Sequence, residues 1–195
     1  MRIIPRFLFA FLACLGYTPL AHAIDFTPLQ AETSEDGALF QRMYFTDQGM
    51  RIYFRAPPAW RTAGTPAAFT FSPPELNSSF IRLEAAPAKD AAIPLDEKGV
   101  ERLRAIAQSL IPAQFAKPVE QWETVNPMTL QGWTSFEVGY SGQAKGLEFY
   151  RSVLFINLSP ERQIRVIVEG PTAEFKNLYE TAYRSLSSWW EVPNK

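Results

Sequence analysis

The chain has 195 residues, a formal net charge of −1, a single cysteine and a single histidine. This length is enough for one domain with a sizeable hydrophobic core. The near-neutral charge provides no basic patch of the kind that binds nucleic acid, so no nucleic-acid partner is expected. Aromatic residues make up 14% of the chain and there are 16 prolines, a composition that favours a sheet-rich domain with frequent loops.

The first 23 residues have the pattern of a secretory signal peptide. Arg2 and Arg6 form a short basic region, and the apolar stretch at residues 7–15 is much shorter than the roughly 20 residues that span a bilayer. An A-x-A pattern ends at Ala23, which predicts cleavage there. We therefore expect an exported protein of the periplasm or the extracellular space, with no transmembrane segment in the mature chain.

Cleavage after Ala23 would remove the only cysteine, Cys14, and the only histidine, His22. Removing 23 of the 195 residues leaves 172, and the loss of two arginines shifts the formal charge from −1 to −3. Such a chain has no thiolate nucleophile, no imidazole base and no zinc site of the usual His/Cys kind, so we expect no metal and no cofactor. A lipid-anchored protein modified at Cys14 is the alternative, although the residues before Cys14 fit a lipobox poorly.

The elements of the mature chain follow from its apolar patterns. Residues 24–38 are polar and acidic and are predicted to form a flexible N-terminal arm, which leaves residues 39–195 as a single domain. Strands are predicted at residues 39–46, 50–56, 69–71, 80–86, 119–125, 133–140, 147–158 and 163–169. The first two alternate with period two and are joined by a turn in which Gly49 can adopt positive φ.

Two helices are predicted, one in the middle of the chain and one at its end. The first begins after Asp96, a suitable N-cap, and is stopped by Pro112. The second follows Pro171 and carries apolar residues at helical spacing from Phe175 to Trp190. Such a stripe is typical of a helix that packs against the core.

The two longest predicted strands, residues 147–158 and 163–169, form a hairpin around a type I turn that contains Pro160. Folding the hairpin about this turn sets Phe155 opposite Val166. Because the hairpin is apolar on both faces, both faces must be covered. We therefore predict the α+β class, with an antiparallel β-sheet flanked by helices on both faces, which is an α/β/α sandwich.

Two segments resemble a known family. One is Ile52-Tyr53-Phe54-Arg55-Ala56-Pro57-Pro58-Ala59-Trp60, and the other is Ser185-Leu186-Ser187-Ser188-Trp189 near the end of the last helix. Together with the order of the elements, they resemble the PsbP-like superfamily, which often has an aromatic strand followed by proline, glycine and tryptophan. Ala59 stands where that glycine would be. The resemblance implies an α/β/α sandwich and a mostly non-catalytic role in binding or assembly, with no shared ligand.

Two carboxylates are the remaining catalytic candidates, because glycoside hydrolysis requires only a pair of them. A four-residue loop after residues 133–140 would set Tyr150 opposite Glu137 and make Glu137 and Glu148 diagonal neighbours. A charged face in contact with solvent explains the same pattern equally well. No catalytic residue is therefore assigned, and a cofactor-free hydrolase is an alternative function.

Trp122 and Lys145 are the residues that we assign to ligand or partner binding. Trp122 has polar neighbours on both sides, and Lys145 belongs to the glycine-containing loop 142–146. Aromatic anchors beside polar loops are favoured binding features. Arg151 lies on a strand face between apolar residues, so it requires a carboxylate partner if it is buried.

The leading hypothesis is an exported, non-enzymatic binding or accessory domain of the bacterial envelope. Its expected partner is an envelope protein or a small ligand. The alternatives are the hydrolase that uses paired carboxylates and a lipoprotein subunit of an envelope complex.

Overall fold

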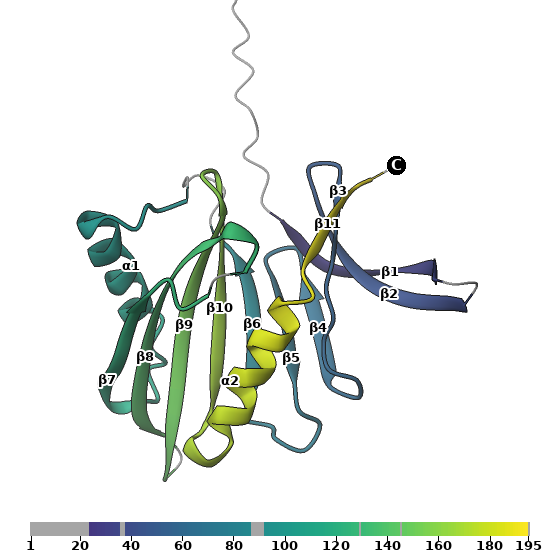
Figure 1. Ribbon diagram of the computed structural model, residues 1–195. Helices are drawn as coiled ribbons and strands as arrows, with labels where there is room; N and C mark the ends of the chain where they lie inside the picture. Colours follow the sequence, from purple (N-terminus) through teal and green to yellow (C-terminus); the bar gives the residue numbers. More distant parts are fainter. Residues whose placement is uncertain (1–23, 36–37, 87–91, 129, 145, 195) are drawn as a thin grey trace, which may run out of the picture.

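The computed structural model describes residues 24–35, 38–86, 92–128, 130–144 and 146–194. Within these residues it contains two antiparallel β-sheets, one of seven strands and one of four, together with two α-helices. The α+β class is therefore confirmed, but the strands form two sheets where the sequence predicts one. Figure 1 shows the β1–β2 hairpin of the small sheet projecting from the body of the molecule.

The elements have the following bounds. In spatial order, the large sheet contains β4 (Arg61–Thr65), β5 (Ala68–Ser72), β6 (Phe80–Ala85), β10 (Arg162–Pro171), β9 (Leu147–Ser159), β8 (Thr134–Ala144) and β7 (Ala116–Val125). The small sheet contains β1 (Asp25–Glu35), β2 (Ala38–Asp47), β3 (Met50–Tyr53) and β11 (Trp190–Pro193). The α-helices are α1 (Glu97–Ser109) and α2 (Thr172–Leu186), and η1 (Leu130–Gly132) is a short 3₁₀ segment.

The central hairpin has the predicted turn but a register that differs by one residue. β9 and β10 are joined at Pro160, as expected. A register shift beside this turn pairs Phe155 with Arg165 and Leu154 with Val166, so the predicted pairing of Phe155 with Val166 is wrong. A bulge places one extra residue on one strand, and a slip of one residue moves every side chain to the other face.

Alternate residues of β9 enter two different hydrophobic clusters. Leu154 and Ile156 belong to the large cluster that includes the buried side chains of α2. Val153 and Phe155 belong to a second cluster that includes Leu103 of α1. In Figure 1, α2 crosses the strands of the large sheet near β10 and β6, whereas α1 lies at the end of the sheet that contains β7 and β8.

The helix α1 has the predicted cap. The side chain of Asp96 accepts a hydrogen bond from the backbone N–H of Gly99 at 2.7 Å, which satisfies one of the free donors at the helix start. The helix ends at Ser109, before Pro112. Both ends of this helix are therefore set by local signals.

The helix α2 ends earlier than the apolar stripe predicts. Its last residue is Leu186, and Trp189 is fully buried after a turn in which its N–H donates to the Leu186 carbonyl at 3.0 Å. Trp190 is not part of the helix but begins β11 and pairs with Tyr53. The prediction of a helical, buried Trp190 is therefore wrong, because the chain leaves the helix to add a strand to the small sheet.

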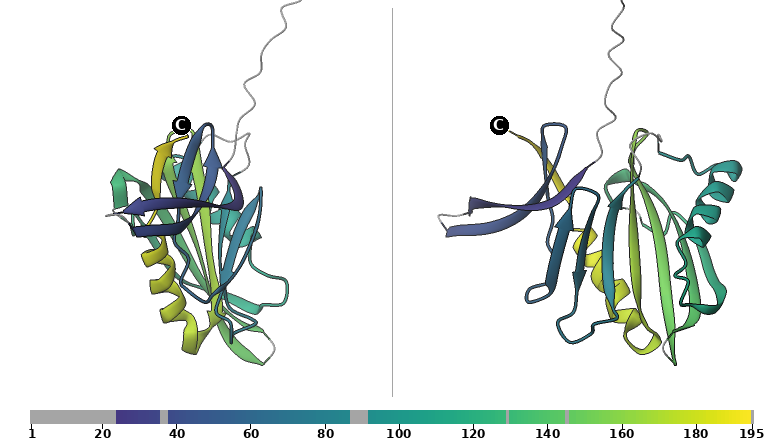
Figure 2. Two further views of the ribbon diagram at one scale, coloured as in Figure 1. Left: turned by 90° about the vertical axis from the view of Figure 1, so that its right-hand side faces the viewer. Right: turned by 180° about the vertical axis from the view of Figure 1, so that it is seen from behind.

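Residues 24–35 contain a paired strand rather than a flexible arm. β1 pairs with β2 at Asp25 and from Leu29 to Glu35, with a register shift between them, and Ile24 and Phe26 are buried in the core. The Phe26 ring lies edge-on to Phe45, with centroids 5.1 Å apart. The polar composition of this segment hides these anchors, because only a few of its side chains enter the core. The two views of Figure 2 show the same projecting hairpin.

Candidate functional site

Four side chains form a continuous row across one face of the small sheet. Leu29 of β1 lies opposite Tyr44 of β2, which lies opposite Tyr53 of β3. Trp190 of β11 pairs with the other side of Tyr53. The Tyr53 ring centroid is 5.9 Å from that of Tyr44 and 5.6 Å from that of Trp190. Directly opposite residues of antiparallel strands share a face, and we call Leu29, Tyr44, Tyr53 and Trp190 the aromatic row.

The aromatic row is accessible although its members are large and mostly apolar. The exposed fraction is 41% for Leu29 and 55% for Trp190, and the two tyrosines are half-buried. The opposite face of the small sheet carries Phe45 and Ile52, which are completely buried in the core. Contiguous exposed apolar groups on one face are a feature of interaction surfaces.

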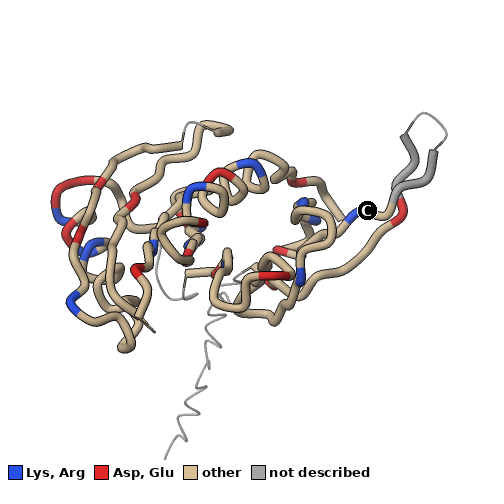
Figure 3. Tube along the Cα trace, turned by 90° about the horizontal axis from the view of Figure 1, so that it is seen from below, with Lys and Arg blue, Asp and Glu red and all other residues tan. Residues whose placement is uncertain are grey.

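Arginines flank the aromatic row. The Arg51 guanidinium lies 5.1 Å from the centroid of the Tyr44 ring, and its Nε donates to Asn194 Oδ1 at 2.8 Å. Arg42 is two residues before Tyr44 on β2, so it lies on the same face. In the part of the chain that Figure 3 colours, positive and negative residues are interspersed.

Two adjoining grooves open beside the aromatic row. The first has a volume of about 460 Å³ and is lined by residues 41–43, residues 53–56 and Ser188. The second has a volume of about 390 Å³ and is lined by residues 55–58, Thr181, Arg184, Ser185, Ser187 and Ser188. They share Arg55, Ala56 and Ser188, so together they run from the row to the end of α2. We call the two together the Arg55 groove.

The chain that follows the groove contains an unusual backbone conformation. Ala59 has a φ of 65°, and the Trp60 N–H donates to the Pro57 carbonyl at 3.3 Å. This left-handed region favours glycine, because a Cβ is crowded there. A glycine would adopt this conformation more easily than the alanine that stands here.

The structure does not bring Glu137 and Glu148 together. Only two residues separate β8 from β9, so Glu137 pairs with Leu154 and not with Tyr150. Glu148 is six residues from Leu154 along β9, which is about 20 Å in an extended strand. The predicted four-residue loop is wrong, and the carboxylate pair that depends on it does not form.

Glu137 is instead part of a buried polar cluster beneath α2. Its exposed fraction is 1%, and its carboxylate accepts hydrogen bonds from Ser152 Oγ at 2.5 Å and from the hydroxyls of Tyr179 at 2.8 Å and Tyr183 at 3.3 Å. Burial, followed by the bond between the two tyrosines and the nearby charge of Glu137, raises the pKa of Tyr179. Burial and Glu137 likewise raise the pKa of Tyr183. Both hydroxyls are therefore donors at neutral pH, and they attach α2 to the sheet.

Trp122 is half-buried on β7 and contacts the aromatic side chains around the start of α2. Its ring centroid is 6.0 Å from that of Tyr150 and 5.9 Å from that of Phe175. A Cβ placed on Gly139 would lie 2.1 Å from the Trp122 ring, so the ring occupies the space that the missing side chain leaves. This tryptophan therefore has a packing role, whatever else it contacts.

The other predicted site residues, Lys145 and Ala23, lie outside the described residues, as does the whole predicted signal peptide. In the ranges that the structure describes, no helix is long and apolar enough to cross a membrane. The same ranges contain no group of three or more His, Cys, Asp or Glu side chains that could hold a metal ion.

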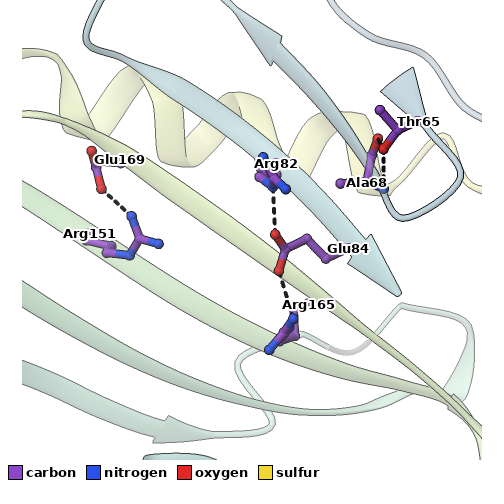
Figure 4. Close-up of polar contacts among 7 residues, drawn as sticks. All are labelled: Thr65, Ala68, Arg82, Glu84, Arg151, Arg165 and Glu169. Carbon is purple, nitrogen blue, oxygen red and sulfur yellow. Dashed lines mark hydrogen bonds and ion pairs between the residues drawn. The ribbon is translucent and has the colours of Figure 1, made fainter. Parts of the chain in front are cut away.

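Arg151 has the carboxylate partner that its burial requires. Its guanidinium forms an ion pair with Glu169, and both side chains are buried (Figure 4). Burial raises the pKa of Glu169, and the charge of Arg151 only partly opposes this effect. Glu84 nearby bridges Arg82 at 2.6 Å and Arg165 at 2.9 Å. The Arg151–Glu169 pair links β9 to β10, and the Glu84–Arg165 pair links β6 to β10, so both are structural.

Sequence reasoning alone does not find the aromatic row. The period-two pattern shows that Tyr53 shares a face with Arg51 and Arg55, but an exposed and a buried face of one strand look alike in this segment. The aromatic row contains one residue from each of four strands. The pairing of β11 with β3 joins residues far apart in the chain, so no short stretch of the sequence indicates it. The one local hint is the adjacent pair Trp189-Trp190, because neighbouring side chains of a strand point to opposite faces.

Comparison with known proteins gives no family. No protein-family model matches the chain, and no curated protein matches it. Solved structures of similar arrangement include LpqN of Mycobacterium tuberculosis, which is involved in cell envelope biogenesis. The match covers 86% of this chain and 92% of the LpqN chain, with 12% sequence identity and a TM-score of 0.47.

Two further structures are similarly distant. One is the Ran-binding protein Mog1p of Saccharomyces cerevisiae. The match covers 84% of this chain and 96% of the Mog1p chain, with 11% sequence identity and a TM-score of 0.46. The other is a Pseudomonas aeruginosa protein of unknown function. The match covers 82% of this chain and 94% of that protein's chain, with 11% sequence identity and a TM-score of 0.40. Likenesses at this level assign no function.

Proposed function

We propose that this chain is an exported PsbP-like domain of the bacterial envelope that binds an envelope protein through the aromatic row and has no enzymatic activity. The observation that carries the proposal is the row itself. Leu29 and Trp190 expose large apolar side chains at its two ends, and Tyr44 and Tyr53 connect them without a break. A rigid sheet supports the row from behind, so little ordering is needed when a partner binds.

The PsbP-like part of the proposal is that the domain is an α/β/α sandwich with helices on both faces of the large sheet. Two observations support it. Leu154 and its neighbour Val153 enter different clusters, one with α2 and the other with α1. The left-handed Ala59 follows the aromatic strand where the family often has glycine. The non-enzymatic part is supported by the separation of Glu137 from Glu148, which leaves the predicted hydrolase without its pair of carboxylates.

The test is capture of a partner by the purified mature chain, followed by measurement with the purified partner. We expect one envelope protein to bind the wild type and to lose about 30-fold in affinity with Trp190→Ala, because aromatic anchors contribute about 2 kcal/mol or more to interfaces. Leu29→Ala should weaken binding as well. Val125→Ala is the control, since Val125 is also exposed, at 49%, but lies on β7 of the large sheet, on the face opposite to Trp122.

The result that contradicts the proposal is equally clear. A partner that binds Trp190→Ala and Leu29→Ala as tightly as the wild type does not use the aromatic row. Equal losses with Val125→Ala would mean that exposed apolar groups away from the aromatic row also cause the binding. A hydrolytic activity that disappears with Glu148→Gln would replace the binding role by an enzymatic one.

A second contact region is proposed at Trp122 and the loop 142–146, which contains Lys145. Its support is that β7, which carries Trp122, is the edge strand of the large sheet and is exposed along most of its length. Because the Trp122 ring also packs against Gly139, Trp122→Ala is expected to lower stability. Lys145→Ala is therefore the cleaner variant for the capture experiment.

A further inference from the structure

Among the described residues, the Arg55 groove is lined by basic side chains and by no acidic ones. Three arginines, Arg42, Arg55 and Arg184, are among the described residues that line it, and no aspartate or glutamate is among them. The remaining lining consists of the Gln41 amide, hydroxyl groups, backbone and apolar side chains. A group of guanidinium ions with no carboxylate in the same lining attracts anionic ligands.

Two of these arginines are available to a ligand. Arg55 is exposed, and its side chain forms no hydrogen bond or ion pair with any residue that the structure describes. Arg184 is also exposed, and its Nε donates only to the Glu180 carbonyl of its own helix at 3.3 Å. Guanidinium groups bind carboxylates with two parallel hydrogen bonds, so each can take one carboxylate.

The backbone that carries these arginines is held in place. The Arg55 N–H donates to Ser188 Oγ at 2.8 Å, and the same hydroxyl donates to the Ser185 carbonyl at 2.6 Å. Ser188 thereby ties the end of β3 to the end of α2. The two arginines are therefore presented on a fixed frame, which lowers the ordering cost of binding.

We propose that the Arg55 groove binds an extended acidic peptide segment of the partner protein. The inference rests on the proposed function, because the groove and the aromatic row share Tyr53 and one partner would cover both. An extended segment is favoured over a compact ligand because the two grooves join at Arg55, Ala56 and Ser188. Carboxylates of the segment pair with Arg55 and Arg184, while the serine hydroxyls that line the groove can bond its backbone.

The probe is a display library of random octapeptides selected on the purified mature chain. Selected peptides should be enriched in aspartate and glutamate. A synthetic peptide from this selection should bind less tightly as salt is raised, since exposed charge pairs are screened. Its affinity should fall about tenfold with Arg55→Glu and about tenfold with Arg184→Glu, as expected when one charged hydrogen-bonding pair is lost.

Lys176→Glu is the matched control. It lies on the same helix as Arg184, its side chain is 86% exposed, and it changes the net charge by the same amount. This variant should bind the peptide as the wild type does. A peptide in which one glutamate is replaced by lysine should regain affinity for Arg55→Glu or Arg184→Glu, which a variant that has merely lost its fold cannot show.

The outcomes separate the groove from the aromatic row. The inference is overturned if the selected peptides lack acidic residues, or if acidic peptides bind both arginine variants as tightly as the wild type. In that case the aromatic row is still supported if Trp190→Ala abolishes partner capture. If peptide binding depends on the arginines but Trp190→Ala still captures the partner, the groove is confirmed as a peptide site and the aromatic row is excluded as the partner site. A dimer of the wild type that Arg55→Glu dissociates in sedimentation would assign the groove to a second copy of this chain and overturn the inference.

Discussion

Glu137 is a buried carboxylate that hydroxyl groups stabilise. Ser152, Tyr179 and Tyr183 donate to it, and no ion pair among the described residues includes it. A buried charge is costly unless its hydrogen bonds are satisfied, and three donors meet that requirement. The cluster connects β8, β9 and α2, so its role is to set the position of the helix on the sheet.

The first prediction concerns these hydroxyls. Tyr179→Phe should lower the free energy of unfolding by about 1–3 kcal/mol, because a buried carboxylate loses a donor. Tyr183→Phe should cost less, since its bond to Glu137 is longer, at 3.3 Å against 2.8 Å. Urea unfolding measures both, with Tyr150→Phe as the control. Equal midpoints for Tyr179→Phe and Tyr150→Phe would show that the hydroxyl contributes nothing.

At the scale of the element, the junction between α2 and β11 gives two neighbouring tryptophans opposite environments. Trp189 is 1% exposed and contacts Phe54 and Trp133 edge-on in the core. Trp190 is 55% exposed at the end of the aromatic row. The change from helix to strand between Leu186 and Trp190 turns the second ring outward.

This difference predicts very different costs of truncation. Trp189→Ala should destabilise the protein by about 3–5 kcal/mol, as large aromatic truncations in cores do. Trp190→Ala should cost less than about 1 kcal/mol, because it removes only surface contacts. Denaturant melts of the two variants, compared with the wild type, measure the difference. Similar costs would show that Trp189 and Trp190 do not differ in burial as described.

At the scale of the whole molecule, Arg162 joins the two sheets. It lies at the start of β10 in the large sheet and pairs with Asp47 of β2 at 2.9 Å and with Glu191 of β11 at 2.9 Å. The core crosses the same boundary, since the rings of Phe45 and Phe69 lie 5.1 Å apart. The small sheet is therefore attached to the large one by both polar and apolar contacts.

The polar contact predicts a dependence on pH. Although burial alone would raise the pKa of Glu191, hydrogen bonds from Arg162 and Trp189 lower it below the usual range. A carboxylate with a lowered folded-state pKa stabilises the protein above its unfolded pKa of about 4.3 and loses that contribution as the pH falls through the folded value. Wild type should therefore be more stable than Glu191→Gln at pH 7, and the two should converge in acid.

Urea midpoints measured at several pH values between neutrality and acid provide the check. Glu161→Gln, at an exposed position in the β9–β10 turn, is the control and should follow the wild type throughout. Parallel curves for wild type and Glu191→Gln would mean that the ion pair with Arg162 does not contribute to stability.

The parts of the fold that the sequence predicts correctly have local causes. Asp96 caps α1, and Pro160 lies in the turn between β9 and β10. The hydrogen bonds of a cap or a tight turn join residues that are close in the chain, so a short window contains their whole signal. The ion pair of Arg151 was equally accessible, because a buried arginine on an apolar face requires a carboxylate.

The parts that the sequence does not predict depend on partners distant in the chain. Phe26 looks like one apolar residue in a polar segment, and only its packing on Phe45 makes the start of the chain a strand. The register shift between β9 and β10 cannot be seen in either strand alone. The pairing of Glu137 depends on how many residues join β8 to β9, and a difference of two residues removes the predicted carboxylate pair.

The sequence by itself determined the α+β class, the central hairpin, the two helices and the burial of the apolar stripe on α2, because hydrophobic periodicity and local hydrogen bonding encode these features. Only the tertiary structure decided that the strands divide into two sheets and that Trp190 joins Tyr53, Tyr44 and Leu29 in one row. The physical reason is that sheet pairing is made between backbones far apart in sequence. Which residues then face each other is set by the closing of the whole core, not by any one strand.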